Sequence, residues 1–140
     1  MSVVSGWSEE RGQELVEFAL VLPIVLLLLL AIVDFGLVIF RYDTVANVGR
    51  EVARYGVVHQ DQTEIDAYIA NNVQRWTAGM DPSALQITYV LTPSTDSPVG
   101  LGTVRVEVAY QHRLLTGPVV QVVSGSPNLE LRTVTTMYTE

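Results

Sequence analysis

The sequence predicts an α+β protein with a long N-terminal transmembrane helix, and three observations point to this fold class. An almost unbroken apolar run covers residues 18–40. Apolar residues then recur at helical spacing as far as residue 76. After Pro82 they recur at every second position, which is the period of a β-strand. We therefore expect a membrane anchor, a second helix and an antiparallel sheet of about three strands.

The apolar run is long enough to cross a bilayer. As a helix it would measure about 34 Å, against about 30 Å for a hydrocarbon core. A cleaved secretory signal has an apolar region of only about 7–15 residues and ends at a small-x-small site. Residues 41–43 (Arg-Tyr-Asp) follow this run without such a site, which favours a retained anchor. Pro23 lies inside it, where a membrane helix tolerates proline with a mild kink at most.

The anchor helix should continue beyond the membrane as an amphipathic half. Apolar residues at spacings of three and four form one stripe, which consists of Val45, Val48, Val52 and Tyr55. Gly49 weakens this half by about 1 kcal/mol relative to alanine, and Gly56 is the expected stop. One helix from Gln13 to Tyr55 would be about 65 Å long, with its second half packed on a domain.

A second helix and three strands should form that domain. Thr63 with Asp66 resembles a capping box, and Gly79 is the expected C-terminal cap of the second helix. Strands are expected over 85–91, 104–110 and 129–138, with a turn-rich loop over 92–102. Residues 114–128 are ambiguous: their four valines, Val119, Val120, Val122 and Val123, could cover the core as a short helix or an extended segment.

Composition excludes several classes of function. The net charge of −7 argues against nucleic-acid binding, which needs a basic face. The absence of cysteine excludes disulfides, thiolate zinc sites and cysteine nucleophiles. His59 and His112 are the only histidines and lie far apart, and no phosphate loop or Gly-x-Ser-x-Gly motif is present. We therefore expect no enzymatic activity, no metal, no cofactor and no small-molecule substrate.

Glu17 is the first candidate functional residue, because it lies at the start of the apolar run and a carboxylate at the edge of hydrocarbon is costly. If the chain were cut after Gly12, Gln13 would carry a free α-amino group one helical turn from Glu17. That amine could pair with Glu17 of the same or a neighbouring subunit and set the axial register of a helical bundle. Alternatively, Glu17 is an ordinary interfacial acid at a helix N-terminus.

The stretch Arg-Gly-Gln-Glu-Leu-Val-Glu-Phe, residues 11–18, resembles the class III prepilin signal. In that family a prepilin peptidase cuts after the glycine, and the glutamate at the fifth mature position is required for processing or assembly. The resemblance therefore makes Gly12 and Gln13 the processing site, and Glu17 and Phe18 the residues of assembly and recognition.

Residues 11–41 more specifically resemble the TadE-like family, pilin-like proteins of the tight-adherence (Flp) pilus and secretion system. The shared features are the Arg-Gly start, the Val-Glu-Phe-Ala block, Pro23 within the apolar run and Asp-Phe-Gly near its end. The resemblance implies a pilin-like fold, a prepilin peptidase as processing enzyme, and other pilin-like subunits or membrane assembly-platform proteins as partners.

Asp34 is a second acid within the apolar run, about 9 Å below its outer end. The favoured interpretation is a contact with an Arg or a backbone donor of a partner's helix. The alternative places it near the interface, hydrated and close to Arg41 on the same face. Together with Pro23 and with Gly36, which could let two helices approach closely, Asp34 forms the predicted intramembrane helix contact.

The orientation of the anchor has two opposite indications. Arg11 precedes the anchor, whereas Arg41, Arg50 and Arg54 follow it, so charge counting would place the C-terminal side in the cytoplasm. The resemblance implies the opposite, with the leader in the cytoplasm and the domain outside the bacterial inner membrane. We adopt the orientation that the resemblance implies.

The sequence thus predicts a leader (residues 1–12), a transmembrane and stalk helix (13–58) and an extracytoplasmic α+β head (59–140). The expected function is that of a single-pass TadE-like subunit of a tight-adherence, type IV-related pilus or secretion machine, which is cut after Gly12 and assembles through its N-terminal helix. The alternative is an unprocessed accessory subunit of another membrane complex, which packs laterally through Asp34 and Gly36.

Overall fold

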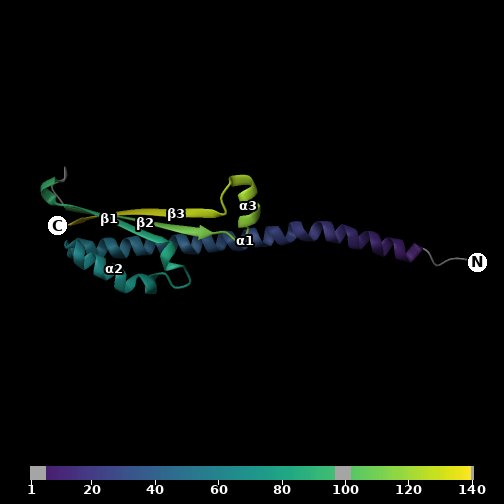
Figure 1. Ribbon diagram of the computed structural model, residues 1–140, viewed down its shortest axis with the longest axis horizontal. Coiled ribbons are helices and arrows are strands. Elements are labelled where there is room, and N and C mark those ends of the chain that lie inside the picture. The colour runs from purple at the N-terminus through teal and green to yellow at the C-terminus, as the bar shows by residue number, and fades with distance from the viewer. Residues whose placement is uncertain (1–5, 97–101, 140) are drawn as a thin grey trace, which may run out of the picture.

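The computed structural model describes residues 6–96 and 102–139, and it confirms the α+β class (Figure 1). Its principal elements, in chain order, are α1 (Gly6–Val58), α2 (Gln62–Trp76), β1 (Leu85–Thr92), β2 (Gly102–Arg113), α3 (Gly117–Ser124) and β3 (Asn128–Thr139). Two short 3-10 helices, η1 (Pro82–Ala84) and η2 (Ser94–Asp96), flank β1. The first residues of the predicted leader and part of the predicted loop over 92–102 lie outside the described residues.

Helix α1 is an uninterrupted helix of 53 residues, about 80 Å long. Its N-terminal half projects away from the rest of the molecule, while its C-terminal half carries the head (Figure 1). It begins at Gly6 rather than at the predicted Gln13, and it continues through Pro23 without a break in the assigned helix. It also continues beyond Gly56, the predicted stop, to Val58.

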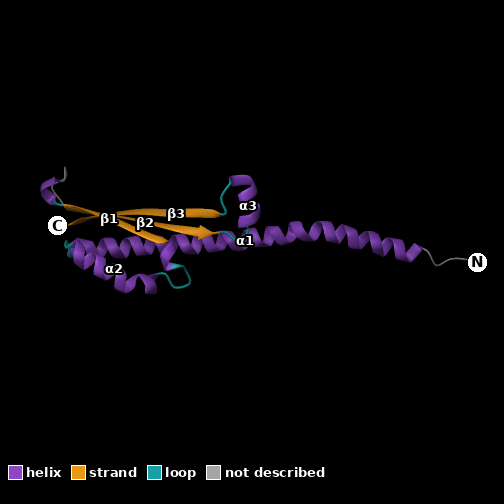
Figure 2. Cartoon of the chain, viewed as in Figure 1, coloured by secondary structure: helices purple, strands orange, loops and turns teal. Residues whose placement is uncertain are grey.

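The sheet has the order β1-β2-β3 and is antiparallel throughout, with β2 in the centre. Figure 2 shows it along one side of the C-terminal half of α1, with α2 along another. The alternation predicted from the sequence decides which face meets α1, because alternate side chains of a strand point to opposite faces. Val104, Val106 and Val108 of β2 are fully buried against the predicted stripe of α1, which includes Val45, Val48 and Val52.

Two glycines let α1 lie close to this sheet. A Cβ added at Gly49 would lie 3.2 Å from Thr135 Oγ1, and one added at Gly56 would lie 2.9 Å from Val104 Cγ1. Both glycines are buried. The sequence suggested that Gly49 only weakens the helix and that Gly56 ends it; the structure shows that both residues allow the helix and the sheet to approach closely.

Helix α2 begins at an aspartate rather than at the predicted capping box. The side chain of Asp61 accepts a hydrogen bond from the Thr63 amide at 2.8 Å and caps the helix. The buried residue of α2 is Ile65, which is 1% exposed and packs into the core beside α1. Tyr68 stacks on Tyr55 with ring centroids 3.9 Å apart, which joins α2 to α1 a second time.

Replacing Ile65 with alanine should destabilise the head by about 2–5 kcal/mol, since it removes a buried side chain and leaves a cavity between α1, α2 and the sheet. The measurement is urea unfolding of the detergent-solubilised protein, followed by circular dichroism. The control is Val58→Ala, which truncates a side chain that is 74% exposed and should change the unfolding free energy by less than about 0.5 kcal/mol. Equal midpoints for the two variants would contradict this account of the core.

The ambiguous segment over 114–128 forms a short helix, α3, but this helix does not cover the core as the sequence suggested. Val122 and Val123 are 86% and 88% exposed, and Val119 is 49% exposed. Helix α3 ends at Ser124, and Gly125 follows it with a φ of 78°, the left-handed conformation that favours glycine after a helix. Val119, Val122 and Val123 therefore form an exposed apolar face of the head, whereas Val120 is half-buried.

Candidate functional site: the anchor helix and its junction with the head

The N-terminal half of α1 has an apolar surface on all sides. Among the described residues, α1 is the helix that is long and apolar enough to cross a membrane. Its most apolar stretch of 18 residues has a mean hydropathy of 3.0, and none of it is buried. Leu20, Ile24 and Phe35 exemplify this exposure at 70%, 69% and 68%. A helix in the core of a soluble protein would be covered, so this surface fits a single-pass membrane anchor.

The predicted processing and assembly residues lie at the start of this surface. Gly12, Gln13, Glu17 and Phe18 are all exposed, and the helix is continuous across the peptide bond that joins Gly12 to Gln13. Among the described residues, no atom would lie within 4 Å of a Cβ added at Gly12, nor of one added at Gly36. The roles of these residues, and of Pro23, in processing or in contacts between helices stay predictions.

Asp34 joins α1 to the start of α3. One carboxylate oxygen accepts a hydrogen bond from the Leu115 amide at 2.7 Å. The other accepts from the Thr116 amide at 2.8 Å and from the Thr116 hydroxyl at 2.6 Å. Asp34 is only 4% exposed, so these three donors replace water as its partners. We call this set of hydrogen bonds the Asp34 clasp.

The clasp lies at the N-terminal end of α3, whose N-cap residue it binds. Thr116 is the N-cap residue, but its hydroxyl makes no capping bond to its own helix. The carboxylate of Asp34 binds the amides of Leu115 and Thr116, just before the helix, and so lies near the positive end of the helix dipole, where a negative charge is favoured. The donors come from the same chain, which the sequence did not indicate; the predicted contact of Asp34 with a partner's helix stays a prediction.

Arg41 forms a second contact between α1 and the head. Its guanidinium donates to Nδ1 of His112 on β2, and it lies 5.9 Å from the centroid of the Tyr110 ring. His112 is 1% exposed, and its Nε2 has no hydrogen-bond partner among the described residues. Burial, followed by the positive charge of Arg41, lowers the pKa of His112, so this imidazole is held neutral. Arg41 therefore packs on the head, through His112 and Tyr110 of β2.

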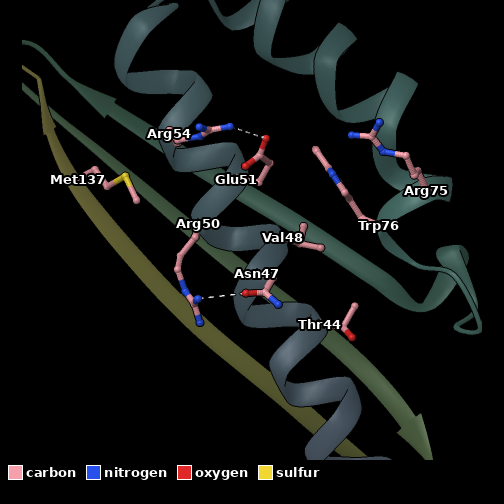
Figure 3. A pocket seen from close by; sticks show the side chains of 9 residues that line it. All are labelled: Thr44, Asn47, Val48, Arg50, Glu51, Arg54, Arg75, Trp76 and Met137. Atoms are coloured by element: carbon pink, nitrogen blue, oxygen red, sulfur yellow. Dashed lines mark hydrogen bonds and ion pairs between the residues drawn. The ribbon is translucent and has the colours of Figure 1, made fainter.

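An open groove of about 580 Å³ runs between α1, α2 and β3 (Figure 3). It is lined by Thr44, Asn47, Val48, Arg50, Glu51, Arg54, Arg75, Trp76 and Met137. Several of its polar groups are already paired: Arg50 donates to Asn47, and Glu51 accepts from both Arg54 and Tyr68. The Tyr68 hydroxyl, followed by Arg54, lowers the pKa of Glu51. In the described parts of the chain, no group of three His, Asp or Glu residues could hold a metal ion.

Tyr89 of β1 should ionise at a higher pH than an ordinary tyrosine. Its hydroxyl donates to Asp66 Oδ1 at 2.7 Å, and burial together with this carboxylate raises its pKa to about 12. An unfolded tyrosine ionises near pH 10, so this contact stabilises the fold below about pH 10 and the contribution is lost as the pH rises towards 12. Titration of the tyrosinate absorbance measures this step, and Tyr89→Phe should remove it. A variant with an unchanged titration curve at the highest pH would contradict the assignment.

Comparison with protein-family models matches residues 12–54 to the family described as TadE-like protein. The match covers the anchor, the Asp34 position and most of the amphipathic half of α1, and it confirms the resemblance seen in the sequence. Searches of curated proteins and of solved structures returned no match.

Proposed function

We propose that this chain, which carries the TadE-like segment over residues 12–54, is a single-pass membrane subunit of a tight-adherence, Flp-type pilus or secretion machine. The family match and the apolar helix together support a pilus-related membrane subunit. The observation that carries the proposal is the division of α1, whose first half is bare and apolar and whose second half is covered by the head. A helix of this kind can leave lipid and pack against other apolar helices without unfolding its head.

The proposed assembly step begins with cleavage by a prepilin peptidase after Gly12. The new α-amino group of Gln13 would then lie one helical turn from Glu17, or next to Glu17 of a neighbouring subunit. Because an unpaired charge among apolar helices is costly, this pair would favour a single axial register. The exposed position of Glu17 on α1 leaves it accessible to such a partner.

In the proposed orientation, the N-terminus faces the cytoplasm and the head lies outside the bacterial inner membrane. The proposed role is structural and not catalytic. The partners would be the bilayer, the prepilin peptidase, and other pilin-like subunits or proteins of the assembly platform.

The test is the intact mass and the N-terminal sequence of the protein from native membranes. We expect the N-terminus at Gln13, which would demonstrate cleavage and create the amine that Glu17 is proposed to meet. Retention of residues 1–12 in the assembled protein would overturn the proposal and would instead indicate an unprocessed accessory subunit of another membrane complex.

A further inference from the structure

We propose that α3 and the uncharged chain around it form a second membrane-contact site, which lies in the leaflet on the side of the head. This inference rests on one part of the proposed function, namely that α1 crosses a bilayer, and not on cleavage or pilus assembly. The ligand is the lipid surface itself: the boundary between headgroups and acyl chains.

The first observation is the exposed face of α3. Val119, Val122 and Val123 follow the spacing of one helical face and are 49%, 86% and 88% exposed. Leu115, just before the helix, is 54% exposed. Single exposed apolar side chains are common on proteins, but a continuous group on one short element marks an interaction surface.

The second observation is the absence of charge. From Leu114 to Leu129 the sequence has no charged side chain, whereas Arg113 and Glu130 flank this segment directly. A loop that stays in water has no need to avoid charged residues. A segment that enters the boundary of a bilayer does, because a charge placed in hydrocarbon is costly.

The third observation is the level at which the segment is held. The Asp34 clasp fixes Leu115 and Thr116 beside α1 at Asp34, before the apolar run ends at Phe40. From this point α3 extends away from α1 and crosswise to its axis (Figure 1). If α1 crosses the bilayer close to the membrane normal, α3 therefore lies along the membrane plane.

The length of the uncovered part of α1 before Asp34 also places α3 within the leaflet. Residues 18–33, between Glu17 and the clasp, span about 24 Å, which is shorter than a hydrocarbon core of about 30 Å. The difference of about 6 Å is made up if the end of the head enters the leaflet, and interfacial helices bury their apolar face to about 5–10 Å. The carboxylate of Asp34 can tolerate this depth because its three donors are supplied by the protein.

The test uses the absence of native cysteine, which allows one fluorescent label at a time on the full-length protein. Val122→Cys, labelled with a polarity-sensitive dye, is reconstituted in phosphatidylcholine and phosphatidylglycerol vesicles at about one protein per vesicle. Val90→Cys is the matched control, since Val90 is an exposed valine (55%) on the sheet face that points away from α1. Leu28→Cys, in the middle of the bare helix, reports insertion of α1.

We expect the label at position 122 to emit at shorter wavelength than the label at position 90. It should also be quenched more by lipids that carry a shallow spin label than by lipids with a deep one, whereas position 28 should show the opposite order. If the label at position 28 is quenched but the label at position 122 behaves like the one at position 90, the proposed contact of α3 with lipid is refuted, while α1 still acts as a membrane anchor. If position 28 is not quenched either, the membrane anchor itself fails. If position 122 becomes shielded only at high protein density, α3 binds another copy instead of lipid, and the inference is overturned.

Discussion

Replacing Asp34 with alanine is expected to release α3 from α1 while the sheet remains folded. The variant removes the acceptor of the Leu115 amide, the Thr116 amide and the Thr116 hydroxyl; the two bonds to Thr116 are buried and the bond to Leu115 is partly buried. Each unsatisfied buried donor costs about 1–3 kcal/mol, and bonds to a charged acceptor are stronger than average. We therefore expect a local loss of about 3 kcal/mol or more, confined to the segment that the clasp holds.

Amide hydrogen exchange measures this loss residue by residue. In Asp34→Ala the Leu115 and Thr116 amides should exchange at least 100-fold faster, which corresponds to about 2.7 kcal/mol, while the amides of β2 that pair with β1 keep their protection. In Asp34→Asn, which retains one acceptor oxygen, the exchange rates of these two amides should lie between those of the wild type and those of Asp34→Ala. The control is Asp43→Ala, which removes an exposed acid from the same helix. Unchanged exchange at Thr116 in Asp34→Ala would show that the clasp does not hold α3.

Replacing Glu17 with alanine is expected to abolish assembly, or processing, without impairing insertion into the membrane. The variant removes a carboxylate from the start of the apolar run, and a charged side chain costs about 2.5–3.5 kcal/mol at the centre of a membrane helix, so insertion should not weaken. What it loses is the proposed partner of the Gln13 amine. Membrane fractionation, N-terminal sequencing and recovery of assembled material measure the three steps separately.

Glu14→Ala is the matched control for this experiment, because Glu14 is an exposed acid on the same helix but lies one turn closer to the N-terminus. It should be processed and assembled like the wild type. Glu17→Gln keeps the shape of the side chain and removes only its charge, so it should be as defective as Glu17→Ala if the charge pair sets the register. Normal processing and assembly in both Glu17 variants would refute the role of this residue.

The elements that the sequence predicted well are those whose signal is local. The alternation of Val104, Val106 and Val108 with polar residues identified the buried face of β2, because a strand of this kind has one face on the core and the other in solvent. The stripe of valines in the second half of α1 likewise gave both the helix and its buried face. Repeating apolar patterns of this kind can be recognised without knowledge of the rest of the fold.

The contacts that the sequence did not predict depend on residues far apart in the chain. Asp34 was recognised as unusual, but nothing in its neighbourhood points to Thr116; the only local signal there is a Thr-Gly-Pro sequence typical of a helix start. The role of Gly49 depends on Thr135 in the same way. For α3, the sequence left open whether the segment is helical or extended and suggested that its four valines could cover the core, whereas Val119, Val122 and Val123 are exposed.

The close contact of α1 with the sheet leaves no hinge between the anchor and the head. The helix passes from its bare half into the buried half without a linker, and Gly49 and Gly56 bring the sheet directly onto it. The anchor and the head must therefore move together as one unit. A shift of one residue in the axial register of α1 raises the head by about 1.5 Å and turns it by about 100°. A contact that fixes the axial position of Glu17 in an assembly would thereby also fix the rotation of the head about the axis of α1.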